Sequence, residues 1–205
     1  MKRYLPILVA TLCAAPVAAL AFTVNITAGT RALYLQVGQG SFTGTMSNNG
    51  TPQNNATINV VSVTVPAAAV ISGTTQAMTS NSAVSTSYWD GYAFCNPPNQ
   101  VYIGGFYRRP GAVGTATLTV TTAANLVNAT GDTIPFSEIS WASTGNGDAG
   151  AQPIPAGTFV GGVQTLATFN GNTWNESCHT FTFANAAQRA AGTYTGRATY
   201  TMSAP

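Results

Sequence analysis

The chain is built of short runs in which apolar and polar residues alternate, and clusters of turn residues separate these runs. Between residues 115 and 121, Leu118 and Val120 point one way, while the threonines beside them point the other way. Because successive side chains of a strand lie on opposite faces, this alternation predicts half-buried β-strands. No run keeps helical spacing over the length of a helix, so the pattern predicts an all-β protein.

The expected strands follow one another at short intervals, with neutral loops between them. They are residues 22–27, 33–37, 58–65, 100–107, 115–121, 134–141, 157–169, 180–184 and 193–202. Many short strands with Gly-, Pro- and Asn-rich turns predict an immunoglobulin-like or Greek-key antiparallel β-sandwich. We find no linker and no internal repeat, and we expect residues 22–205 to form a single domain.

The first 21 residues have the layout of a cleavable signal peptide. Lys2 and Arg3 are followed by an uncharged apolar run, and Ala19 and Ala21 place small residues at the −3 and −1 positions of a cleavage site. The apolar run is too short for a spanning helix, and no later run is apolar enough to cross a membrane. We therefore expect an exported protein of the periplasm, the cell surface or the extracellular space, with no integral membrane segment after cleavage.

Cleavage would also remove the chain's net charge. Of the seven basic residues, Lys2 and Arg3 lie in the signal peptide, and the remaining five balance the five acidic residues. Binding to nucleic acid needs several basic groups to neutralise phosphates, so the composition excludes this class of partner. A nearly neutral surface rich in Thr and Asn favours self-association.

Two cysteines, Cys95 and Cys178, remain in the mature chain. In an oxidising compartment an isolated pair is expected to form a disulfide. The chain has one histidine, His179, and no Cys-x-x-Cys pair, so we expect neither a metal site nor a cofactor. A Ser-His-Asp hydrolase would need His179 as its base, and a glycosidase would need two acids such as Asp90 with Glu138 or Glu176. No motif selects either arrangement, and we expect a protein that is not an enzyme.

The densest aromatic cluster surrounds Tyr88, Trp89 and Tyr92. Exposed rings in one plane would stack on sugars, which makes these three residues a candidate glycan-binding site. The alternative is that the rings pack around the disulfide.

The two ends of the mature chain resemble a bacterial fimbrial subunit. The stretch AGTYTGRATYTM at residues 191–202 is similar to the last strand of the spore-coat-U-like, archaic class of chaperone–usher pilins. Alternating Phe22, Val24 and Ile26 stand at the mature N-terminus, where pilins carry the strand that they donate to a neighbour.

The resemblance implies assembly by strand donation. Phe22, Val24 and Ile26 would be the donor residues. The acceptor edge would be formed by the inward-facing residues of the last strand, Tyr194, Ala198, Tyr200 and Met202. Such an edge would need a periplasmic chaperone before assembly. A closed sandwich that keeps its own N-terminal strand is the alternative fold.

The leading hypothesis is therefore a secreted, non-enzymatic structural or adhesive surface protein. Its expected partners are copies of itself or a periplasmic chaperone. The alternative is a carbohydrate-binding module, whose partners would be surface glycans.

Overall fold

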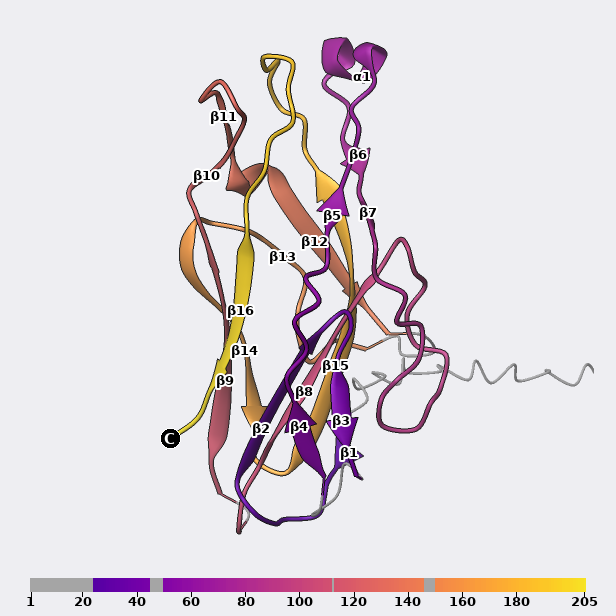
Figure 1. Ribbon diagram of the computed structural model, residues 1–205, viewed down its shortest axis with the longest axis vertical. Helices are drawn as coiled ribbons and strands as arrows, with labels where there is room; N and C mark the ends of the chain where they lie inside the picture. The colour runs from indigo at the N-terminus through magenta and orange to yellow at the C-terminus, as the bar shows by residue number, and fades with distance from the viewer. Residues whose placement is uncertain (1–23, 45–49, 112, 146–149) are drawn as a thin grey trace, which may run out of the picture.

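The computed structural model describes residues 24–44, 50–111, 113–145 and 150–205. Within these ranges the chain forms antiparallel sheets packed as a sandwich, which confirms the all-β expectation (Figure 1). The expected signal peptide and Phe22 lie outside the described residues. In the part of the chain that the structure covers, no helix has the length and apolar character needed to span a membrane.

The larger sheet is centred on β15 (Thr173–Phe183) and β8 (Val101–Arg108). Its hydrogen-bonded order is β13 (Gly157–Thr158), β12 (Ile139–Thr144), β15, β8 and β2 (Ala32–Val37). Two short strands, β1 (Val24–Asn25) and β6 (Gln76–Ala77), also pair with β15.

The smaller sheet has three strands, in the order β14 (Gly162–Asn170), β9 (Thr115–Thr122) and β16 (Ala198–Ser203). It packs over the inner face of the larger sheet and lies at the left of Figure 1. The expected strand at residues 157–169 is divided between the two sheets. Gly161 and Gly162 both have positive φ, at +79° and +70°, and turn the chain from β13 into β14.

The remaining elements are short and lie mainly at the two ends of the sandwich (Figure 1). They are the pairs β3 (Ser41–Thr43) with β4 (Thr51–Gln53), β5 (Val61–Ser62) with β7 (Thr79–Ser80), and β10 (Asn125–Val127) with β11 (Thr133–Pro135), the helix α1 (Ala67–Ser72) and the 3₁₀ turn η1 (Phe136–Glu138).

The larger sheet is buried on both faces, so the molecule has two hydrophobic clusters. All eight residues of β8 are buried, and their side chains divide between the clusters. Val101 and Ile103 belong to the inner core between the sheets, whereas Tyr102 and Phe106 belong to a second cluster on the opposite face. We call this second cluster the outer core. Its members are Ile26, Tyr34, Phe94, Cys95, Tyr102, Phe106, Trp174 and Cys178.

Candidate functional site: the open edge at β16

The strand β16 lies at one edge of the smaller sheet. Residues 198–203 pair in unbroken antiparallel register with β9, from Ala198 opposite Thr122 to Ser203 opposite Thr117. No described strand pairs with the opposite edge of β16. That edge therefore presents backbone donors and acceptors with which a further strand could pair.

The side chains of β16 alternate between the inner core and the exterior. Ala198, Tyr200 and Met202 pack against the inner core yet remain only partly buried, while the residues between them are exposed. Met202 Cε lies 3.4 Å from the position that a Cβ would take on Gly105 in β8, so this side chain reaches across to the larger sheet. The strand is thus fixed on its inner side and open at its edge.

β2, at the edge of the larger sheet, lies close to this edge of β16. Cα atoms of β2 approach those of β16 within 8 Å, but the two strands are not hydrogen-bonded to each other. Leu35 and Val37 of β2 pack against the inner core and are only partly buried.

Residues 58–65 lie beside the end of β2. The Asn59 amide donates a hydrogen bond to the Val37 carbonyl, and Val61, Val63 and Val65 face the inner core while remaining partly buried. The expected strand at residues 58–65 keeps its alternation, although its backbone is paired as a strand only at β5.

The other edge of the smaller sheet is different. The register between β14 and β9 shifts between Thr165 and Ala167, which marks a bulge or irregularity in this edge strand. Bulges, prolines and charged side chains are the usual means by which proteins block pairing at an exposed edge. The six residues of β16 include none of these features, so β16 is the better template for an added strand.

Of the four candidate acceptor residues, Tyr194 lies outside β16. It precedes the strand, packs against the inner core and is partly buried, and its hydroxyl donates a hydrogen bond to the Ala190 carbonyl at 2.8 Å. The other three candidates, Ala198, Tyr200 and Met202, form the inward face of the edge strand.

The candidate donor strand is paired within its own chain. Val24 is the register partner of Trp174, and Asn25 is that of Thr173, so β1 extends the larger sheet beside β15. The Ile26 amide also donates a hydrogen bond to the Asn172 carbonyl at 2.9 Å. Ile26 is 5% exposed and belongs to the outer core.

Replacing Ile26 with alanine is expected to lower the free energy of unfolding by about 2 kcal/mol, because the change leaves a cavity in the outer core. Urea denaturation measured by circular dichroism would show the change. The matched control is Thr27→Ala at the exposed neighbouring position, expected to change stability by less than about 0.5 kcal/mol. Equal effects of the two variants would show that β1 does not hold its place on β15.

The candidate glycan-stacking rings do not share one environment. Tyr88 and Trp89 are partly buried and pack against the outer core, and the Tyr88 hydroxyl donates a hydrogen bond to the Gly40 carbonyl at 3.1 Å. Tyr92 is 56% exposed. The structure therefore places two of the three rings in packing around the disulfide and leaves Tyr92 at the surface.

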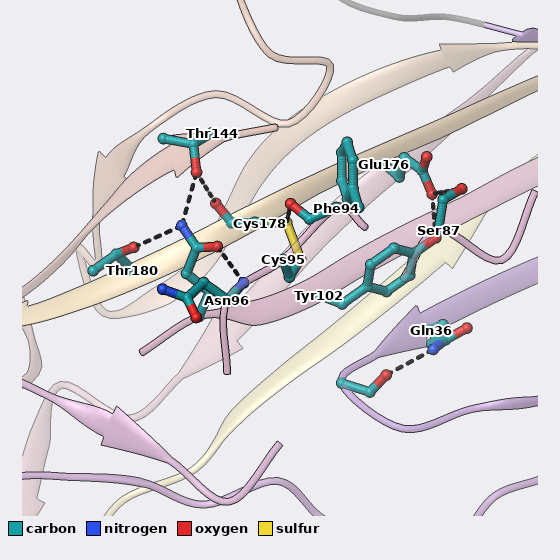
Figure 2. The surroundings of a disulfide bond; sticks show 12 residues. Gln36, Ser87, Phe94, Cys95, Asn96, Tyr102, Thr144, Glu176, Cys178 and Thr180 are labelled. Carbon is teal, nitrogen blue, oxygen red and sulfur yellow. Dashed lines mark hydrogen bonds between the residues drawn. A yellow bond between two sulfur atoms is a disulfide. The ribbon is translucent and has the colours of Figure 1, made fainter. Parts of the chain in front are cut away.

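The expected disulfide joins Cys95 to Cys178 across a sequence separation of 83 residues, with the two Cα atoms 5.5 Å apart. Figure 2 shows this bond. It attaches residues 88–95, which we call the aromatic loop, to Cys178 at the centre of β15. Beside it, the Glu176 carboxylate accepts three hydrogen bonds on one oxygen, from Ser87 at 3.0 Å, Tyr102 at 2.5 Å and Trp174 at 2.9 Å. Burial and the Glu176 carboxylate raise the pKa of Tyr102 well above its ordinary value, so this phenol remains a donor.

The residues considered for catalysis have structural surroundings. The Asp90 carboxylate accepts a hydrogen bond from the Tyr92 amide at 2.9 Å, and Glu138 forms an ion pair with Arg189 at 2.6 Å. His179 is 0% exposed in the inner core, where it stacks on Trp141 with 5.8 Å between ring centroids. In the described ranges, no three His, Cys, Asp or Glu side chains gather in a way that could hold a metal ion.

Comparison of the chain with protein-family models, with curated proteins and with solved structures yields no match.

Two features of the site were not expected from the sequence. The first is the proximity of β2 to β16, together with the packing of residues 61–65 against the inner core. Both runs alternate in the sequence, but alternation does not say which strands end as neighbours. The second is the Glu176 cluster, whose hydrogen-bond donors Ser87 and Tyr102 lie 89 and 74 residues away in the chain. No local sequence signal marks a contact of that range.

Proposed function

We propose that this protein is an exported, non-enzymatic structural or adhesive surface subunit that accepts a β-strand from another chain at the open edge of β16. The incoming strand would pair with the backbone of β16 and lay its apolar side chains against Ala198, Tyr200 and Met202. Main-chain hydrogen bonds would provide affinity, and the alternating side-chain positions would provide specificity.

One observation carries the proposal. The edge of β16 is unpaired among the described strands, has no protective feature, and is lined by apolar side chains that pack on the core without being fully covered. A closed sandwich would be expected to bury these side chains or to block the edge. The likeness of residues 191–202 to the last strand of archaic chaperone–usher pilins supports the same proposal.

A lysine introduced at Ala198 is expected to prevent assembly, because it places a charge on the inward face where the added strand would pack. The matched control is Thr199→Lys, which carries the same charge on the exposed face of the same strand. Each variant would be produced in the cells that normally export the protein, and detergent-resistant assemblies from the cell surface would be quantified. We expect Ala198→Lys to lower the assembled fraction about tenfold or more and Thr199→Lys to leave it unchanged.

Thermal unfolding of both purified variants separates loss of assembly from loss of folding. The proposal fails if folded Ala198→Lys protein assembles as the wild type does. It also fails if the wild type is found only as a free monomer in the exported material.

The hypothesis of a carbohydrate-binding module stays a prediction. Its test is binding of oligosaccharides by the wild type and by Tyr92→Ala, since Tyr92 is the exposed member of the three rings.

A further inference from the structure

We infer that this chain accepts a strand but donates none, so that it occupies an end of any assembly that it joins. The inference rests on the proposed function, because it concerns the partner of the same β16 edge. It follows from the pairing of β1 with β15 and from the short length of mature chain expected before β1.

The first step concerns what β1 does in its own subunit. Its register with β15 and the Ile26 amide hydrogen bond fix it beside Trp174, which is 1% exposed. Val24 and Ile26 both pack in the outer core, the cluster that also contains the disulfide. Release of β1 for donation would uncover part of this cluster and break the hydrogen bond that the Asn172 carbonyl accepts from the Ile26 amide.

The mature chain expected before β1 is short. With cleavage after Ala21, only Phe22 and Thr23 precede β1, and two extended residues span at most about 7 Å. The six residues of β16 extend over about 20 Å. The free part of the mature N-terminus would therefore be too short to cover the edge of a neighbour while β1 stays in place.

The third step identifies the partner. Since this chain keeps its own N-terminal strand, the strand at β16 would come from a different protein. The inward positions at Ala198, Tyr200 and Met202 call for apolar residues at every second position of that strand. Neither β16 nor β2 contains a charged residue, so the strand that the partner inserts would be uncharged as well. The partner is thus a chain with a free, uncharged, alternating strand.

The test locks β1 onto β15. Asn25 and Thr173 are register partners, and the double variant Asn25→Cys/Thr173→Cys would tie them together by a disulfide. The matched control is Asn25→Ser/Thr173→Ser, which cannot form this bond. Mature wild type, locked variant and control would be compared by size-exclusion chromatography with light scattering. Their affinity would then be measured for a synthetic peptide that serves as the added strand. The peptide is as long as β16, and in it Val alternates with Thr between terminal lysines.

We expect all three proteins to be monomeric and to bind the peptide with equal affinity, and we expect Ala198→Lys to bind it about tenfold more weakly or worse. Homopolymers of wild type and control that are absent from the locked variant would overturn the inference and leave the proposed function standing. If the wild type fails to bind the peptide and also fails to form homopolymers, the β16 edge is not an acceptor and the proposed function falls instead.

Discussion

Replacing Cys95 and Cys178 together with alanine is expected to lower the free energy of unfolding by about 4.5 kcal/mol. The bond closes a span of 83 residues, and its loss restores the corresponding chain entropy to the unfolded state. Alanine is the suitable replacement because both sulfur-bearing side chains are buried, at 8% and 0% exposure, and a serine would add an unpaired hydroxyl. Guanidinium denaturation of the two proteins, with the slope of free energy against denaturant fitted separately for each, would measure the loss.

A second measurement separates the disulfide's local role from its effect on the unfolded chain. The aromatic loop is attached to β15 by this bond and covers the outer core with Tyr88 and Trp89. In the double variant, acrylamide should quench tryptophan fluorescence more strongly under native conditions, because Trp89 loses its attachment. A stability loss below about 1 kcal/mol would contradict the expectation and show that the loop is held by packing alone.

The general architecture could be predicted from the sequence because alternation reports burial directly. The run at residues 115–121 became β9, and its Leu118 and Val120 are 0% and 1% exposed in the inner core. The disulfide could also be predicted, since removal of the expected signal peptide would leave two cysteines and therefore one pairing. In both cases the signal can be read from the sequence without knowing which distant strands become neighbours.

The longest strand was largely missed for a physical reason. The sequence predicts a strand at residues 180–184, but β15 begins at Thr173. Its first half includes Asn175, Glu176 and Ser177, which are polar yet all buried. A strand covered on both faces has no exposed side to alternate with. The hydrogen-bond partners of Glu176 and Ser177 include Tyr102 and Ile154, which lie far away in the chain.

The N-terminal strand shows the same limit at the candidate site. Alternation at Val24 and Ile26 identifies apolar side chains that must be covered, and both are packed in the outer core. It does not state whether β15 of the same chain or an edge of a neighbour covers them. That choice depends on which position beside β15 is vacant, and β12 leaves this position open because its pairing with β15 ends at Cys178.

Acidification from pH 7 to pH 4 is expected to remove about 3 kcal/mol of stability through His179 alone. Burial lowers the pKa of this imidazole from 6.5 to about 4, and the nearby Ile154 backbone acts in the opposite direction. Because the folded-state pKa lies below the unfolded one, the unfolded chain binds the proton first. The contribution is fully present above pH 6.5, is lost progressively as the pH falls through 4, and levels off below that value.

The variant His179→Phe isolates this contribution. A phenyl ring keeps the stacking on Trp141 and the packing with Phe181 but cannot be protonated. Urea denaturation at pH 7 and pH 4 should show a loss about 3 kcal/mol larger in the wild type than in the variant. All other titratable groups are present in both proteins, so any contribution from them cancels in the comparison. Equal losses would mean that the imidazole gains a proton acceptor on acidification. Water would then reach Ser177 and His179, which are both fully buried in the structure.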